Sequence, residues 1–432
     1  MASRFFGSCS PFSGAARRFQ YSAALRSPLL CFLLLSAFVP AAHPQFLLKP
    51  AQPGEHVTLM PSDTAILESD DIRKDLPCTV TPRKPDVGFD LRFHGGYDVT
   101  LPLRELSGPG ELLSVVFRVY AQDDRTHPSY FVQHFRVPAI DDEAKGDVLL
   151  QGGIDVGEGK YHIDWLMRDR AERICSSSWE FEAVLPPKDK PMPLFINPNE
   201  IAESVPEPFV NDSVARQRQT EDALNVKLLV NFAPQNVHSA ALERSDTDAL
   251  VSILKAIQRN PHIGRISLVA FNVSEGRIVY RQESAESIDF PSLGKALDSM
   301  KLGTVNVLRL GQKHSDTDFL AGLIEKEVGA SAHPDAVIFA GPKAMLDANV
   351  PEEDLRRIGD IECPVFYMNY NLNPQAVPWK DSISHAIKAF KGTEYTISRP
   401  RDLWLSTTEM VSRIVRSKKE HALASAAAGG AQ

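Results

Sequence analysis

The sequence predicts an α+β protein made of an antiparallel β-sandwich followed by a doubly wound α/β domain. Three observations predict this class. Short strand-like runs follow one another between Cys78 and Leu185 with no helical run between them. Seven prolines then fall in the segment "PPKDKPMPLFINPNEIAESVPEPF". From Val226 onward, apolar strand-like runs alternate with amphipathic helical runs, which is typical of a mostly parallel sheet.

Residues 1–42 have the composition of a secretory signal peptide. They contain four arginines and no acidic residue, and a short apolar run spans Pro28 to Ala42. This run is shorter than a membrane span requires. We therefore expect cleavage, a secreted or periplasmic protein, and no transmembrane segment in the mature chain. An uncleaved N-terminal anchor is the alternative.

The charge balance excludes nucleic acid as the main partner. The formal charge is -8, and removal of the four signal-peptide arginines lowers it to -12. Binding to phosphate backbones depends on clustered lysines and arginines, so an acidic chain predicts a different class of partner.

Two cysteines of the predicted β-sandwich are candidates for a disulfide. Cys78 and Cys175 fall in the same predicted domain, and an oxidising compartment permits their pairing. The bond would close a loop of about 97 residues, worth on the order of 4–5 kcal/mol in the chain-entropy model. Two buried thiols are the alternative.

The β-sandwich is expected over residues 78–185. Its strands are predicted in the runs "DVGFDLRF", "LLSVVFRVYAQ", "SYFVQHFRV", "GDVLLQGGIDV", "GKYHIDWLMRD" and "ERICSSSWEFEAVL". The last two predict a hairpin around Arg170 and Ala171, with Trp165 and Trp179 on its paired strands as core residues. Residues 186–225 are predicted to be a linker, because their prolines disfavour both helix and central strand.

The α/β domain is expected over residues 226–418. The run "VKLLVNFA" is apolar throughout, as in a parallel strand covered on both faces. The run "SDTDALVSILKAIQRNP" predicts the first helix, with Ser245 or Asp246 as its N-cap. Strand and helix patterns then alternate to Lys418. The low-complexity segment 419–432 is predicted to be a disordered tail.

This order of elements resembles a von Willebrand factor type A domain. The whole layout, with a signal peptide and a β domain before it, looks like that of secreted bacterial proteins of this kind. The resemblance implies a metal site built from an Asp-x-Ser-x-Ser loop after the first strand, a threonine and a second aspartate. At the loop positions this sequence has Asn231, Ala233 and Gln235. Thr317, between Asp316 and Asp318, matches the threonine.

The metal motif is therefore degenerate. The second aspartate is expected near Gly341 or Pro342 and is absent there. Mg²⁺ requires hard oxygen ligands, usually with one or two carboxylates, and Asn231 and Ala233 do not supply them. We expect no metal and no cofactor. The segment "SDTD" also fits a helix N-terminus whose acidic residues complement the helix dipole.

The first hypothesis for function is an exported, non-enzymatic module of the adhesion type that binds a protein or a cell-envelope component without a metal. Binding would use three loops at the carboxyl ends of the α/β strands, 231–237, 315–318 and 341–343. The candidate binding residues are Asn231, Gln235, Asp316, Thr317, Asp318 and Lys343.

The second hypothesis is a secreted hydrolase that uses polar residues at the same carboxyl edge. No G-x-S-x-G nucleophile motif and no glycine-rich nucleotide motif occurs in the sequence, so we assign no catalytic residue. A cell-envelope structural component without a specific ligand is a third interpretation.

Overall fold

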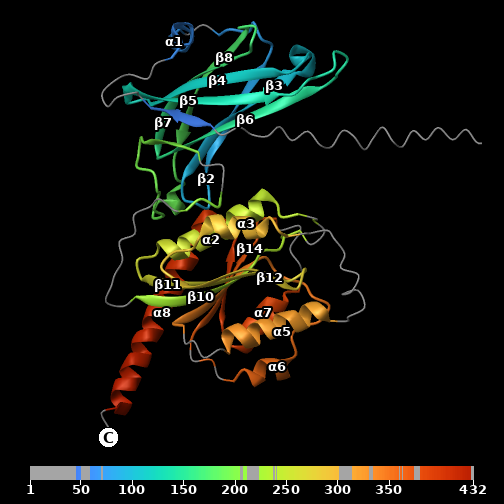
Figure 1. Cartoon of the computed structure of the whole chain (residues 1–432). Coiled ribbons are helices and arrows are strands. Elements are labelled where there is room, and N and C mark those ends of the chain that lie inside the picture. The colour runs from blue at the N-terminus through green and yellow to red at the C-terminus, as the bar shows by residue number, and fades with distance from the viewer. Residues whose placement is uncertain are drawn as a thin grey trace, which may run out of the picture. The chain divides into compact units, whose positions relative to one another are not determined.

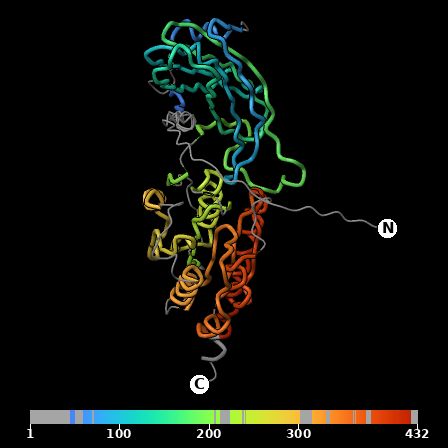
Figure 2. Tube along the Cα trace, turned by 90° about the vertical axis from the view of Figure 1, so that its right-hand side faces the viewer, coloured from blue at the N-terminus to red at the C-terminus, as the bar shows by residue number. Residues whose placement is uncertain are grey.

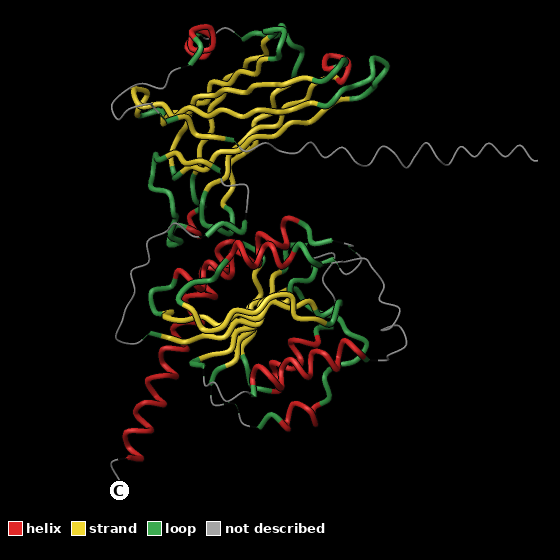
Figure 3. The backbone as a smooth tube through the Cα atoms, in the orientation of Figure 1, coloured by secondary structure: helices red, strands yellow, loops and turns green. Residues whose placement is uncertain are grey.

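The computed structural model describes residues 45–49, 59–69, 72–204, 208–211, 223–236, 239, 241–300, 314–329, 334–359, 361, 363–373 and 380–429. The predicted signal peptide lies outside these residues. The described chain is a mixed α+β protein with three sheets (Figures 1 and 3). Two of the sheets belong to residues 46–203, here called the β-rich part, and the third belongs to residues 224–397 within the α/β part.

The first sheet of the β-rich part is antiparallel and has the strand order β1-β5-β4-β7-β8. A short helix, α1 (Pro61–Glu68), packs on β4 and β7 through Leu67. The strands are β1 (Phe46–Leu48), β4 (Glu111–Ala121), β5 (Asp124–Val137), β7 (Gly159–Arg168) and β8 (Ile174–Ala183).

The second sheet has the order β2-β3-β6-β9. Its strands are β2 (Thr79–Val87), β3 (Phe93–Pro102), β6 (Asp147–Val156) and β9 (Ile201–Glu203). Apolar side chains of both sheets form one core, in which the Tyr97 ring of β3 contacts Phe117 and Trp165 edge-on at 5.5 and 5.4 Å. The two sheets therefore form a β-sandwich, and the path of the chain through them can be followed in Figure 2.

The predicted hairpin of the last two long strands is confirmed. Strands β7 and β8 pair in antiparallel register over their whole length, and Trp179 stands opposite Ile163. Cys175 of β8 forms a disulfide with Cys78, the residue before β2, with the two Cα atoms 6.2 Å apart. This bond connects the two sheets covalently across the core.

One strand prediction for this part is wrong. The predicted strand "DVGFDLRF" instead contains the turn between β2 and β3, because Gly88 accepts a turn hydrogen bond from Leu91. Part of the predicted linker 186–225 packs on the β-sandwich: β9 pairs with β6, and Met192 and Ile196 are buried. Strand β9 has only three residues, which is too short to produce a periodic pattern. The prolines on either side of it made the segment resemble a loop.

The third sheet has six strands in the order β12-β11-β10-β13-β14-β15, all parallel except β12. Every residue of β13 and β14 is buried, as the continuous apolar runs predict. The strands are β10 (Leu224–Asn231), β11 (Ile263–Asn272), β12 (Arg277–Ala285), β13 (Ala336–Gly341), β14 (Val365–Tyr370) and β15 (Thr393–Ile397).

Helices cover both faces of this sheet (Figure 1). One apolar core packs α2 (Arg244–Arg259), α3 (Phe290–Leu297) and α8 (Pro400–Gly429) against one face. A second core packs α5 (Ser315–Val328), α6 (Glu352–Arg357) and α7 (Ser382–Ala389) against the other. This is a doubly wound arrangement. None of the helices in the described chain is long and apolar enough to span a membrane.

Two helix ends differ from the prediction. The N-cap of α2 is Glu243, and Asp246 is its third helical residue. Helix α8 continues to Gly429 through most of the predicted disordered tail 419–432. The tail is rich in alanine, the residue with the highest helix propensity, and it follows a helix that is already nucleated.

A buried carboxylate joins three elements of the α/β part. Glu327 of α5 has a side chain that is 2% exposed, and it lies 3.1 Å from Lys227 Nζ of β10 and 2.6 Å from Arg281 Nη2 of β12. Burial raises its pKa, but the hydrogen bonds and charges of Arg281 and Lys227 hold it below its usual value. The carboxylate therefore stays ionised in the core.

Replacement of Glu327 by alanine leaves Lys227, whose side chain is 12% exposed, without its counter-charge. We expect Glu327→Ala to lower the free energy of unfolding by about 3–5 kcal/mol. The exposed Glu325, in the same helix turn, is the matched control, and Glu325→Ala should change it by less than about 0.5 kcal/mol. Urea denaturation checks both, and equal losses in the two variants would contradict the role of this carboxylate.

Candidate functional site

The carboxyl edge of the parallel sheet brings the loops of the predicted site together. Strands β10 and β13 are neighbours and run parallel, so the residues after Asn231 and Gly341 leave the sheet at the same edge. Gly341 has a φ of +152°, and a Cβ at this position would lie 2.8 Å from Asn231 Cβ. Only glycine allows the two strand ends to approach this closely.

Gln235 fixes one loop of this edge to another. It is buried, and its Oε1 accepts hydrogen bonds from the backbone N–H of Leu372 at 2.9 Å and Asn373 at 3.3 Å. Its Nε2 donates to the carbonyl of Asn373 at 2.8 Å. A single amide side chain therefore holds the segment that follows β14 against the loop that follows β10.

Asp246 completes the attachment from the other side. Its carboxylate accepts from the backbone N–H of Gln235 at 3.3 Å and of Glu243 at 3.1 Å, and from the Tyr370 hydroxyl at 3.0 Å. Burial raises the pKa of Asp246, and these hydrogen bonds oppose the rise. Gln235, Asp246 and Tyr370 form one buried set of hydrogen bonds, here called the Gln235 network.

Asn231 and Thr317 are also directed into the protein. Asn231 is fully buried, and its Oδ1 accepts from the backbone N–H of Val273 at 3.1 Å. Thr317 is 3% exposed, and its Oγ1 donates to the carbonyl of Ala348 at 2.9 Å. This bond connects the first turn of α5 to the loop after β13.

The remaining predicted residues lie nearer the surface. Asp316 and Asp318 are in the first turn of α5, and Asp318 is exposed. Lys343 is half-buried in the loop after β13. Strand pairing and the Thr317 hydrogen bond thus bring the described residues of the three predicted loops to one edge, while only part of the predicted side-chain set faces outward.

These residues do not fit a magnesium ion. Mg²⁺ requires near-octahedral oxygen ligands with carboxylates among them. The oxygens of Asn231, Gln235 and Thr317 already take part in internal hydrogen bonds, and Ala233 has no ligand atom. These side chains instead hold the loops of the edge in place by hydrogen bonds.

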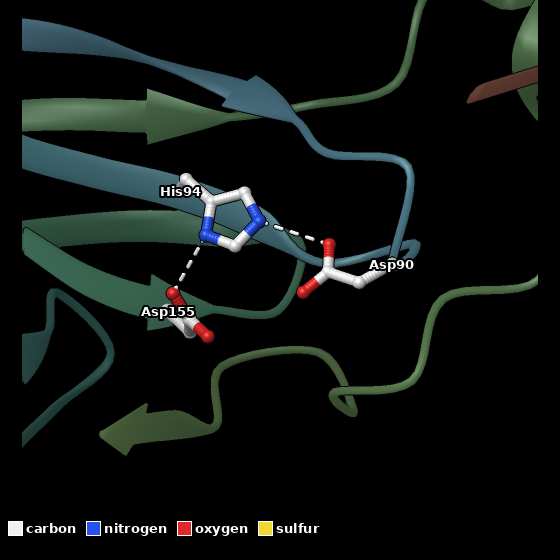
Figure 4. A group of neighbouring side chains, drawn as sticks. All are labelled: Asp90, His94 and Asp155. Atoms are coloured by element: carbon white, nitrogen blue, oxygen red, sulfur yellow. Dashed lines mark hydrogen bonds and ion pairs between the residues drawn. The ribbon is translucent and has the colours of Figure 1, made fainter. Parts of the chain in front are cut away.

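A second group of polar residues lies in the β-rich part, where the sequence predicted no site (Figure 4). His94 Nδ1 lies 2.8 Å from Asp155 Oδ1, and His94 Nε2 lies 2.9 Å from Asp90 Oδ1. Asp155 is buried, whereas the His94 side chain is 41% exposed. We call these three residues the Asp90–His94–Asp155 cluster.

The two neighbouring carboxylates control the protonation of His94. Burial alone would lower the pKa of His94, but its hydrogen bonds to Asp155 and Asp90, together with their charges, raise it to about 10. The sequence did not reveal the cluster because Asp155 is 61 residues from His94 and only the pairing of β3 with β6 brings them together. Within the cluster, only Asp90 and His94 are close in the sequence, four residues apart.

A half-buried acid lies near the carboxyl edge as well. Asp381 is the N-cap of α7, and its Oδ1 accepts from the backbone N–H of Ile383 and Ala344, both at 3.1 Å. Its Oδ2 is buried without a hydrogen-bond partner among the described residues. Burial, with a smaller contribution from the charge of Glu394, raises the pKa of Asp381 to about 6 despite the backbone hydrogen bonds.

No protein-family model and no characterised protein sequence matches this chain. Among solved structures, proximal thread matrix protein 1 from the mussel byssus is similar at 9% identity with a TM-score of 0.28, over 43% of this chain and 46% of that chain. This chain thus spans less than half of the mussel protein. The PilB minor pilin from Streptococcus sanguinis is similar at 8% identity with a TM-score of 0.25, over 70% and 87% of the two chains.

A glycosyl hydrolase family 2 member from Bacteroides cellulosilyticus DSM 14838 is similar at 8% identity with a TM-score of 0.18, over 74% of this chain and 38% of that chain. At these TM-scores no function follows from any of the three likenesses.

Loss of the Gln235 side chain should loosen the loop after β14. Gln235→Ala leaves the N–H groups of Leu372 and Asn373 without their acceptor, so we expect destabilisation of about 1–3 kcal/mol. Amide hydrogen exchange at Leu372 and Asn373 should accelerate at least tenfold. Lys343→Ala, at the same edge but outside the network, is the control. Unchanged exchange in Gln235→Ala would show that the amide does not hold this loop.

The raised pKa of Asp381 predicts a pH dependence of stability. The neutral carboxyl suits the folded state better, so this contribution to stability is complete below the unfolded pKa near 3.8 and is lost as the pH rises through about 6. Asp381→Asn keeps an N-cap acceptor and removes the titration. The unfolding free energy of Asp381→Asn minus that of the wild type should rise by up to about 3 kcal/mol from pH 4 to pH 7. A difference that is constant over this range would contradict the prediction.

Proposed function

We propose that this protein is an exported binding module whose α/β part recognises a protein or cell-envelope component through its carboxyl-edge loops, without a metal. The observation that carries the proposal is the Gln235 network. In this network, buried polar groups fix the loops of the edge in place. Exposed residues outside the network, such as Asp318, can then contact a partner. We include in the proposal that the α/β part is a von Willebrand factor A-like domain.

Export is supported by two features of the chain. The Cys78–Cys175 disulfide is of the kind that persists in oxidising compartments. The first 42 residues have the composition of a secretory signal peptide. Both features favour a secreted or periplasmic location.

The hydrolase hypothesis has less support at this edge. A hydrolase of the serine or cysteine type needs an acid that orients a histidine next to the nucleophile. In the described part of the edge, Asp246 and Asp381 accept hydrogen bonds from backbone amides, and Asp246 also from a tyrosine. These acids serve to position loops and helix ends.

The proposal is tested by affinity capture with the full-length exported chain as bait, in envelope extract with and without a chelator. We expect recovery of the same partner under both conditions. Reversal of charge at the edge by Asp318→Lys should reduce recovery at least fivefold. Glu325→Lys makes the same change in the last turn of α5, at the opposite end of the helix, and should leave recovery unchanged.

Two outcomes would contradict the proposal. Recovery that depends on the chelator in the wild type and is insensitive to Asp318→Lys would place the binding elsewhere. Equal losses in Asp318→Lys and Glu325→Lys would show a general electrostatic effect rather than a surface at the carboxyl edge.

A further inference from the structure

We propose that a buried water molecule is bound between Asn231 and Asn369 at the carboxyl edge of the α/β sheet. Both side chains are fully buried. Each has one polar atom without a hydrogen-bond partner among the described residues, Nδ2 of Asn231 and Oδ1 of Asn369. Buried polar atoms that lack a protein partner usually bond to ordered water. This site does not depend on the function proposed for the edge.

The two asparagines flank a glycine in the strand order β10-β13-β14. Gly341, at the end of β13, pairs with Asn369 of β14. On the other side of β13, Asn231 follows Val230, which pairs with Ala340. Asn231 therefore adjoins Gly341 from one side of the strand and Asn369 adjoins it from the other.

Both side chains lie on the same face of the sheet. Side chains along a strand point alternately to its two faces. Leu229, two residues before Asn231, lies in the core that packs α5, α6 and α7 against the sheet. Tyr367, two residues before Asn369, lies in the same core. Asn231 and Asn369 therefore face this side of the sheet together.

The partners of the two amides determine which atom of each is left over. Asn231 accepts from the backbone N–H of Val273 at 3.1 Å, so its bonded atom is the oxygen and its NH₂ group remains. Asn369 donates to the carboxylate Oε1 of Glu394 at 2.6 Å, so its bonded atom is the nitrogen and its oxygen remains. One side chain thus offers a donor, and the other offers an acceptor.

The bonds already made are directed away from the glycine. Val273 follows β11, which pairs with β10 on the side opposite β13. Glu394 belongs to β15, which pairs with β14 on the side opposite β13. Because each bonded atom is directed to an outer strand, the remaining atom of each amide is left on the side of Gly341.

The gap between the two amides suits a small neutral group. Two strand spacings separate the backbones of Asn231 and Asn369 by about 10 Å, and Gly341 places no side chain between them. An NH₂ group repels a cation, a carbonyl oxygen repels an anion, and full burial excludes a larger ligand. A water molecule accepts from Nδ2 and donates to Oδ1, so it links the ends of β10 and β14 across β13.

A third asparagine of the same edge provides an internal comparison. Asn272, at the end of β11, is also fully buried. Its Nδ2 donates to the carbonyl of Phe232 at 2.6 Å, and its Oδ1 accepts from the backbone N–H of Glu275 at 2.8 Å. Both ends of this amide have protein partners, so we expect no bound water at Asn272.

The test is the nuclear Overhauser effect between water and asparagine side-chain NH₂ groups, measured on the full-length exported chain with isotope-labelled asparagine. We expect a direct signal from long-lived water at the NH₂ group of Asn231 and none at Asn272. Asn369→Leu removes the acceptor of the water and fills the gap with methyl groups, so it should reduce the Asn231 signal at least fivefold. Asn349→Leu makes the same change at an exposed position in the loop after β13 and should leave the signal within twofold of the wild type.

A wild-type chain without the Asn231 signal would overturn the proposal, as would a signal that persists in Asn369→Leu. Circular dichroism checks that the variants fold. If Asn369→Leu does not fold, a crystal structure of the wild-type chain decides. We expect one water within hydrogen-bond distance of Asn231 Nδ2 and Asn369 Oδ1, and a direct bond between the two amides or a protein atom in that place would overturn the proposal. Neither measurement involves partner capture, so failure of this proposal can be told apart from failure of the proposed function.

Discussion

The constraint on which the α/β part depends is that a buried polar group must find a hydrogen-bond partner when water is excluded. At the carboxyl edge of the sheet, backbone amides emerge from strands that are buried on both faces. In the Gln235 network, the Gln235 side chain accepts from the amides of Leu372 and Asn373. The Asp246 carboxylate accepts from the amides of Gln235 and Glu243. A metal ion is one way to organise loops at such an edge, and here side-chain hydrogen bonds perform that task.

The same constraint explains how the protein keeps carboxylates in its interior. Glu327 is ionised because Lys227 and Arg281 contact both of its oxygens. Asp155 is buried beside the protonated His94 and Arg92. Asp381 forms no ion pair among the described residues, and burial raises its pKa. The pKa values of Glu327 and Asp381 thus shift in opposite directions because cations stand next to the first acid and not next to the second.

The parts of the fold that could be predicted are those with a periodic signal. The buried parallel strands appear as continuous apolar runs, and the β7–β8 hairpin appears as two aromatic-rich runs around a turn. Strand β9 and the continuation of α8 could not be read, since the first has three residues and the second lies in a low-complexity segment. Leu372 lies 137 residues from Gln235, and Asp155 lies 61 residues from His94, so only tertiary pairing brings these partners close.

The hydrogen bonds that hold the loops have a consequence for how the proposed binding surface would work. A loop set held by an ion changes shape when the ion or its ligand changes, which couples binding to a conformational equilibrium. Here Gln235 and Thr317 attach neighbouring loops by direct hydrogen bonds to backbone groups. A surface fixed in this way is already ordered before a partner arrives, and the entropy lost on binding is smaller. Recognition at this edge would therefore be constitutive.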